Sequence, residues 1–511
     1  MKILLVYPHY PDTFWSFKHA LRFISKKAAV PPLGLLTVAA MLPESWEKKL
    51  VDMNVSTLSI HDINWADYVL ISAMYIQKES VDKVIKECKR QKKKIIAGGP
   101  LFTQEYDNYP QIDHFILNEA EITLPPFLKA LDEGLNPERI YTTEEYADLS
   151  LSPVPDYSLL SRKLYASMNI QISRGCPYAC DFCEITSLLG HKVRMKNPEQ
   201  VIVELESLYQ LNWRGAVSIV DDNFIGNKKH IKNKLIPVIK EWMVSHKFPF
   251  TFNTQSSIDL ADDEELMSMM TDAGFNSTFI GIETPAEESL QYCNKVQNRH
   301  RDLLQCVKKI QKAGFQVSAG FIVGFDSDLP SVFQRQIDFI QDSGIVSAMV
   351  GLLNAPKNTK LYQRLKAENR LTTEATGSNT DFSMNFIPKM NHRELLEGYK
   401  KIIRNIYEVK PYYKRIRRFL INYKPQVKKK KIDFVYLNAF LKSILIIGMI
   451  NKGRSEYWKL LIWTLIRRPR SFMDAVTYTV YGYHFRSVFG ISRQYGLNLD
   501  ALRKHPQDDY L

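Results

Sequence analysis

Two successive series of short apolar runs, separated by helix-like stretches, make up most of this 511-residue chain. Apolar strands that alternate with helices favour a parallel sheet with helices on its faces. The first series covers residues 1–135, and the second covers residues 166–368. A chain of this length exceeds what a single hydrophobic core can organise, so we expect separate α/β domains.

The first series predicts a doubly wound parallel sheet. We expect its strands and helices at residues 2–7, 33–42, 49–53, 67–72, 81–91, 94–97 and 114–117. Ligands of such sheets bind beyond the carboxyl ends of the strands, where this chain has Ser72, Gly98, Gly99, Pro100 and Glu119. The two glycines would let a flat ligand approach the backbone, although an ordinary turn accounts for Gly-Gly-Pro equally well.

The second series begins after residues 136–165, whose content of Pro, Asp, Ser and Tyr is typical of a linker. Six strands are expected, at residues 168–173, 216–221, 250–254, 278–282, 317–323 and 348–353. This spacing predicts a partial (β/α)6 barrel of the triosephosphate isomerase type, in which catalytic groups gather after the strands. Asp222, Gln255 and Glu283 stand at such positions.

Residues 369–511 predict a helical, basic C-terminal domain. Lys and Arg are dense at 391–420 and 428–431, and the apolar segment 434–450 is too short and too polar to span a bilayer comfortably. We expect a packed helical cap with a solvated basic face, and a peripheral membrane contact is the alternative. Much of the net charge of +13 lies here without a nucleic-acid recognition fold, so we expect no nucleic-acid partner.

Three of the six cysteines, Cys176, Cys180 and Cys183, lie within eight residues, in the pattern CxxxCxxC. Pro8 ends the first apolar run too early for a signal peptide, so we expect a cytoplasmic protein whose cysteines bind metal. Three thiolates on a four-iron cluster leave one iron without a protein ligand, where a cofactor can bind. A structural zinc site would need a fourth ligand, and His191 keeps that alternative open.

The cysteine spacing, with Phe182 before the last cysteine, resembles the signature of radical S-adenosylmethionine enzymes. Residues 219–224, 281–284 and 320–324 are similar to motifs on the second, fourth and fifth strands of that family. The resemblance implies that the cysteines hold a [4Fe-4S] cluster whose open iron chelates S-adenosylmethionine. It also places near the nucleotide Phe182, Asp222, Gln255 and Glu283, although each of the three polar residues could equally satisfy local backbone.

The chemistry that this resemblance implies is radical chemistry. The reduced cluster passes one electron to the sulfonium, and the resulting 5′-deoxyadenosyl radical abstracts an unactivated hydrogen atom. A reductase, flavodoxin or ferredoxin would supply that electron.

The first domain resembles the cobalamin-binding domain that precedes the barrel in one subgroup, where the corrin lies between the two domains. The residues that match its contact regions are Ser72, Met74, Gly98, Gly99, Pro100 and Glu119. The Asp-x-His-x-x-Gly signature is absent, so no histidine ligand is expected from that motif. The C-terminal region and residues 11–18 and 31–34 are similar to the subfamily that contains the hopanoid C-2 methylases.

These features favour a cobalamin-dependent radical methyltransferase that acts on an unactivated carbon of a small molecule or lipid. The first alternative is a radical cyclase or oxidoreductase that transfers no methyl group. The second is a non-catalytic iron–sulfur protein.

Overall fold

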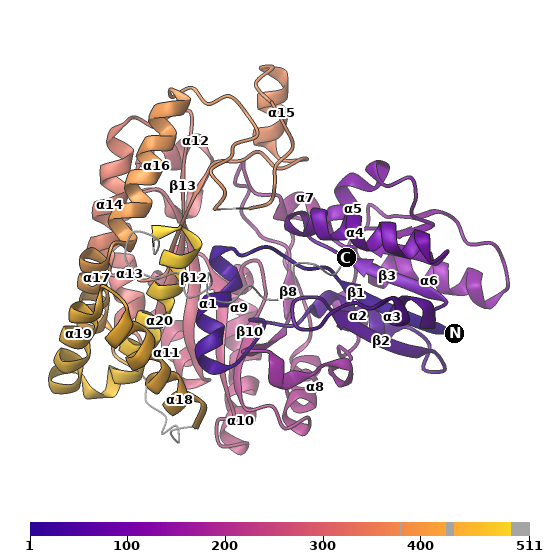
Figure 1. The fold of residues 1–511 in the computed structure, drawn as a ribbon, viewed down its shortest axis with the longest axis horizontal. Coiled ribbons are helices and arrows are strands. Elements are labelled where there is room, and N and C mark those ends of the chain that lie inside the picture. The colour runs from indigo at the N-terminus through magenta and orange to yellow at the C-terminus, as the bar shows by residue number, and fades with distance from the viewer. Residues whose placement is uncertain (379, 426–433, 492–511) are drawn as a thin grey trace.

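The computed structural model describes residues 1–378, 380–425 and 434–491. The chain forms three regions, which Figure 1 shows from right to left. A first sheet lies on the right, a second and larger sheet lies in the centre, and the C-terminal helices cover the left side. The basic block at 428–431 falls outside the described residues.

The first sheet is parallel throughout and has the strand order β2-β1-β3-β4-β5-β6. Its strands are β1 (Lys2–Tyr7), β2 (Glu47–Asp52), β3 (Tyr68–Ser72), β4 (Lys94–Gly98), β5 (His114–Ile116) and β6 (Ile140–Tyr141). Helices α2 (Leu33–Met41) and α6 (Ala120–Asp132) pack on one face, and α3 (Ile60–Trp65), α4 (Lys78–Arg90) and α5 (Pro100–Glu105) pack on the other. The predicted doubly wound sheet is confirmed, and its order reverses between β1 and β3, where ligands of such sheets bind.

The segment expected as a linker, 136–165, contains β6 and three short 3-10 helices. Strand β6 pairs with β5 and so completes the first sheet. Tyr165, near the end of the segment, donates its hydroxyl hydrogen to Asp52 Oδ2 at 2.9 Å. The segment is therefore packed against the first domain rather than being an extended connection.

The second sheet is a curled, open half-barrel of parallel strands in the order β7-β10-β11-β12-β13-β14 (Figure 1). Its strands are β7 (Ser167–Ile170), β10 (Gly215–Ile219), β11 (Phe250–Ser256), β12 (Phe275–Glu283), β13 (Gln316–Val323) and β14 (Ala348–Leu352). Helices α8 (Pro198–Gln210), α10 (Ile236–Ser245), α11 (Glu264–Asp272), α13 (Leu303–Lys312) and α14 (Ser331–Ser343) cover its outer face. This confirms the predicted partial barrel.

Two details of this sheet differ from the sequence-based expectation. The first strand stops at Ile170, and Ser173–Arg174 forms a separate short strand, β8, that pairs antiparallel with β9 (Arg194–Met195). Gln255, expected after the third strand, lies inside β11 and pairs in register with Phe279 of β12. Its neighbours Thr254 and Ser256 are buried while Gln255 is exposed, so Gln255 points to the inner side of the half-barrel.

The C-terminal region is helical, as predicted, and packs on the barrel. Its helices are α15 (Lys360–Ala367), α16 (His392–Tyr407), α17 (Val409–Asn422), α18 (Phe434–Ser443), α19 (Arg454–Arg467) and α20 (Phe472–Val488). The basic run at 391–420 is not only a solvated face, because Arg415 is fully buried against Tyr407 and Tyr412. Among the described helices, none has the length and apolar character needed to cross a membrane.

Candidate active site

The cysteine loop follows β8, at the carboxyl end of β7. Gly175 opens the loop with φ +93°, and a Cβ there would lie 2.7 Å from the carbonyl oxygen of Lys192, so only glycine fits. The loop then folds back, since Cys176 N–H donates to the carbonyl of Gly190 at 3.2 Å. Cys183 N–H donates to the carbonyl of Cys180 at 3.1 Å. These bonds hold the three cysteines on one compact turn.

The three loop thiols are partly accessible, and none of them forms a disulfide. Burial, together with nearby negative charge on Cys180 and Cys176, raises the pKa of Cys183 to about 12. The thiols are therefore close enough to influence one another. Among the described residues, no group of three His, Cys, Asp or Glu side chains has the spacing for a single metal ion.

Two consecutive aspartates after β10, Asp221 and Asp222, accept hydrogen bonds from residues 172–175, which lead into this loop. Asp221 is fully buried; its carboxylate accepts from the N–H of Ile172 at 2.8 Å and from the hydroxyl of Ser173 at 2.6 Å. Asp222 is half-buried and accepts from Gly175 N–H at 3.3 Å. Burial raises the pKa of Asp222 to about 6. Asp222 is thus the more accessible of the two, beside the cysteine loop.

Glu283 ends β12 in the left-handed conformation, with φ +62°. Its Oε1 accepts from Lys295 Nζ at 2.7 Å, and both side chains are nearly buried. The pair lies over Gly281, where a Cβ would collide with Glu283 Oε1 and stand 2.8 Å from Lys295 Nζ. The glycine is therefore required by the ion pair that covers it.

Sequence reasoning missed Lys295. Its ammonium lies 5.9 Å from the centroid of the Phe182 ring. Burial alone would lower the pKa of Lys295, but the negative charges of Glu283, Cys180 and Cys183 raise it above its ordinary value. No local pattern distinguishes this lysine, because only the turn after α12 (Glu287–Tyr292) returns it to the site.

A second residue that sequence reasoning missed is Gln297, which follows in the same turn. Its Nε2 donates to Cys180 Sγ at 3.7 Å. Its Oε1 is buried and has no hydrogen-bond partner within the described chain. A buried amide that contacts a cysteine thiol while its other end is unsatisfied is suited to a site that holds a bound group. The thiol set and this orphaned oxygen together fit an iron–sulfur cluster with a cofactor beside it.

A hollow opens next to these residues, on the inner side of the half-barrel. It has about 690 Å³ of empty space, including its mouth, which is the size of a small-molecule site. Gly281, Gly320 and Gly351 from three adjacent strands form its floor, while Phe279, Ile322 and Met349 make its walls apolar. Phe182 and Glu283 stand at its edge. The predicted residues Phe182 and Glu283 are thus brought together at one cavity.

The carboxyl edge of the first sheet approaches the cysteine loop. Gln104 of α5 donates to Glu184, the residue after Cys183, at 3.2 Å. On this edge Met74 is 43% exposed, and the Ser72 hydroxyl makes no hydrogen bond to the described part of the chain. An exposed apolar side chain beside an available hydroxyl suits a large ligand with apolar and polar parts, such as a corrin.

The fold itself requires the glycine pair on this edge, for which the sequence left ligand approach and an ordinary turn equally open. A Cβ on Gly99, whose φ is +90°, would lie 2.7 Å from Ser72 Oγ, and one on Gly98 would lie 2.7 Å from the Ile116 carbonyl. Neighbouring strands therefore already demand both glycines. Pro100 is exposed and begins α5, with Gly99 as its N-cap.

Glu119, the remaining predicted contact of the first domain, is engaged in joining the two domains. Its carboxylate accepts from Arg194 at 2.6 and 2.7 Å and from Arg174 at 3.0 Å. Arg174 also pairs with Glu121 at 2.8 Å. These side chains are nearly buried, and both arginines flank the cysteine loop. Glu119 thereby sets the position of that loop relative to the first sheet.

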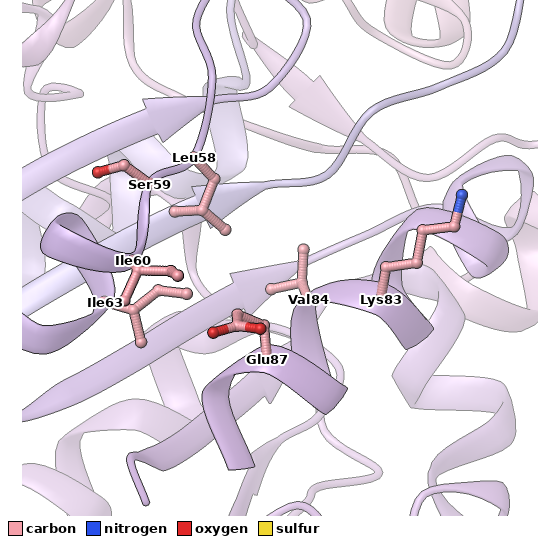
Figure 2. A pocket seen from close by; sticks show the side chains of 7 residues that line it. All are labelled: Leu58, Ser59, Ile60, Ile63, Lys83, Val84 and Glu87. Carbon is pink, nitrogen blue, oxygen red and sulfur yellow. The ribbon is translucent and has the colours of Figure 1, made fainter. Parts of the chain in front are cut away.

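A smaller hollow lies between α3 and α4 of the first domain (Figure 2). Its polar side chains are engaged nearby: Ser59 donates to Asp62 at 2.7 Å, and Glu87 pairs with Arg90 at 2.9 Å. It lies on a helical face rather than at the carboxyl edge of the sheet, and we assign it no role.

Comparison with known proteins agrees with this geometry. Models described as "B12 binding domain", "Radical SAM superfamily" and "Domain of unknown function (DUF4070)" match residues 23–128, 170–340 and 359–495. The chain is 40% identical to an uncharacterised methyltransferase of Synechocystis sp., over 99% of this chain and 96% of that protein. It is 33% identical to the hopanoid C-2 methylase of Rhodopseudomonas palustris, over 81% of this chain and 78% of that protein.

A solved structure has the same fold. It is the cobalamin-dependent S-adenosylmethionine radical enzyme OxsB with aqua-cobalamin and S-adenosylmethionine bound, with a TM-score of 0.61 at 17% identity. The match covers 99% of this chain and 82% of that chain. The matched domains confirm the predicted cofactor set of [4Fe-4S] cluster, S-adenosylmethionine and cobalamin. The chain belongs to the cobalamin-binding radical S-adenosylmethionine methyltransferase family that includes hopanoid C-2 methylase.

Proposed function

We propose that this protein transfers a methyl group to an unactivated carbon of a small, largely apolar substrate. The observation that carries the proposal is the hollow beside the cysteine loop, with its glycine floor and its apolar walls of Phe279, Ile322 and Met349. The rings of Trp15 and Phe279 meet edge to face, with centroids 5.3 Å apart, so an aromatic side chain of the N-terminal segment supports the apolar lining. Such a lining favours a hydrocarbon-like substrate over a charged one.

Three thiols and one ion pair would hold the cofactors of the barrel. Cys176, Cys180 and Cys183 bind the cluster. Glu283 would accept a hydrogen bond from the amino group of S-adenosylmethionine and Lys295 would donate to its carboxylate, because the two side chains carry opposite charges 2.7 Å apart. When bound, the cluster and S-adenosylmethionine supply radical hydrogen abstraction, and cobalamin supplies the methyl group.

The remaining predicted residues have narrower proposed roles. Phe182 offers its backbone to the adenine, Asp222 accepts from a ribose hydroxyl, and the Gln255 amide accepts from or donates to the ribose hydroxyls. Asp222 has the accessibility that this role needs, and Gln255 is exposed on the inner side of the sheet.

The first domain would present its carboxyl edge to cobalamin. We assign this surface to Ser72, Met74 and the turn at 98–100, and we assign Glu119 to holding the domains together. The corresponding division of the chain is 1–135 for cobalamin, 136–165 as connection, 166–368 for radical chemistry, and 369–511 as the helical domain. The electron donor is a reductase, flavodoxin or ferredoxin, and the protein works in the cytoplasm, peripheral to a membrane.

One experiment tests the proposal directly. The full chain is reconstituted without oxygen, with iron, sulfide, cobalamin and S-adenosylmethionine, and its products are measured by mass spectrometry. Formation of both 5′-deoxyadenosine and S-adenosylhomocysteine is the expected result. Deoxyadenosine without S-adenosylhomocysteine would instead support a radical cyclase or oxidoreductase, and neither product would support a non-catalytic protein.

A further inference from the structure

Two consecutive helical segments near the end of the described chain carry large apolar side chains on their solvent side. Helix α18 continues into the π-helical segment η12 (Ile444–Ile450). Helix α19 then folds back beside η12. Side chains four residues apart share one side of a helix. Here that side, which we call the apolar face, consists of Leu437, Leu441, Leu445, Met449, Trp458, Ile462, Leu465 and Ile466.

The apolar face is strongly exposed although the opposite side of the same helices is packed. Six of its residues leave between 54% and 70% of their surfaces in solvent: Leu441, Leu445, Met449, Ile462, Leu465 and Ile466. Ile447, Tyr457 and Leu461 point the other way and are buried. The core is therefore complete without the exposed set, and a group of exposed apolar side chains of this size marks a contact surface.

Part of the apolar face is preformed. Trp458 Nε1 donates to the Gly448 carbonyl at 2.9 Å, and the hydroxyls of Ser443 and Tyr457 lie 2.8 Å apart. These bonds fix α19 against η12. The part of the apolar face on η12 and the first turn of α19 is thus fixed in the free protein.

The segments that carry the apolar face are rich in cations. Between residues 434 and 472 the sequence has one acidic residue, Glu456, and seven basic ones: Lys442, Lys452, Arg454, Lys459, Arg467, Arg468 and Arg470. Lys452, Arg454, Arg467 and Arg470 are exposed. A second copy of the chain would bring like charges together on such a surface, whereas an anionic surface would complement it.

We propose that the apolar face docks on an anionic lipid bilayer. Its apolar side chains enter the boundary between headgroups and acyl chains, and the cations of these segments contact the phosphate groups. The helices lie in the plane of the interface rather than crossing it. This attachment is independent of methyl transfer, and it would hold the enzyme where apolar substrates are concentrated.

Vesicle co-sedimentation of the full chain tests the proposal. Vesicles of phosphatidylcholine with phosphatidylglycerol should bind the protein, and vesicles of phosphatidylcholine alone should bind it far less. Combining Leu441→Gln, Leu445→Gln, Ile462→Gln and Leu465→Gln should lower the partition coefficient at least tenfold. Combining Lys452→Glu, Arg454→Glu, Arg467→Glu and Arg470→Glu should remove the preference for anionic lipid.

The matched control changes four equally exposed apolar residues on other elements: Leu135→Gln, Leu151→Gln, Val244→Gln and Leu329→Gln. This variant should bind vesicles like the unmodified protein. Equal binding by the apolar-face variant would overturn the proposal. So would sedimentation equilibrium that finds a dimer which the four face changes dissociate, because the face would then join two copies.

A second measurement does not depend on the folding of a multiple variant. Bromine-labelled lipids should quench the tryptophan fluorescence of the unmodified protein, and Trp458→Phe should remove most of that quenching. If the quenching is unchanged in Trp458→Phe, the face does not enter the bilayer.

Discussion

Lys295 Nζ lies 2.7 Å from Glu283 Oε1, and this buried ion pair covers Gly281 at the edge of the hollow. Removing one partner leaves the other charge buried without compensation, which costs about 3–5 kcal/mol. Lys295→Met should therefore lower stability and abolish S-adenosylmethionine cleavage. Thermal unfolding and the rate of 5′-deoxyadenosine formation measure the two effects.

The double variant Glu283→Gln with Lys295→Met separates these effects. It should recover most of the lost stability, because no charge remains buried alone, but it should not recover cleavage. Recovery of cleavage would show that the pair has only a structural role.

Gly281→Ala should disrupt the same site through sterics. The added methyl group would collide with Glu283 Oε1 and approach Lys295 Nζ, so the pair must move. We expect binding of S-adenosylmethionine to weaken at least tenfold, measured by equilibrium dialysis. Gly34→Ala is the control, because a Cβ there meets nothing within 4 Å and the glycine lies in helix α2. That substitution should leave binding unchanged.

Glu119→Gln should loosen the junction between the domains. Arg194 would lose its charged partner and Arg174 would keep only Glu121, at a cost of about 3–5 kcal/mol for a broken buried pair. The expected result is a lower thermal unfolding midpoint. Asp272→Asn, in the exposed pair with Lys240 at 2.8 Å, should cost only about 0–1 kcal/mol. Equal effects of the two changes would contradict this role for Glu119.

Asp221 should make stability depend on pH. Complete burial raises its pKa to about 7, so the folded protein favours the uncharged carboxyl. That contribution is fully present below the ordinary pKa of 3.8, and it is lost as the pH rises through about 7. The thermal midpoint should fall between about pH 4 and pH 7 and level off above that range. Asp221→Asn keeps an acceptor for Ile172 N–H and should flatten this dependence, whereas an unchanged slope would assign it to another group.

Alanine in place of Cys176, Cys180 or Cys183 should abolish both the visible iron–sulfur absorption and S-adenosylmethionine cleavage. Full-occupancy zinc without iron in protein purified without oxygen would contradict the cluster. Cys88→Ser and Cys306→Ser should retain the cluster. Cys293 lies closer, since its carbonyl accepts from Asp181 N–H of the loop at 3.0 Å, but Cys293→Ser preserves that backbone bond and should retain the cluster too.

Most of the fold could be predicted because its strands and longer helices carry their own signals. Runs such as Lys2–Tyr7, apolar after the first residue, become strands buried on both faces. The helices and strands that the sequence did not predict are short or begin directly at a turn. Helix α5, for example, starts at Pro100 directly after two glycines that indicate only a turn.

The sequence by itself determined the cysteine loop, because ligands within eight residues of one another are brought together by local geometry alone. It also determined the order of strands and helices, since period and composition are local properties. Only the tertiary structure decided what Glu119, Gly99 and Lys295 do. Glu119 contacts arginines across the domain junction, Gly99 lies against Ser72 of a neighbouring strand, and Lys295 reaches Glu283 from beyond a helix. A local sequence pattern contains no information on which residues distant in the chain will be in contact.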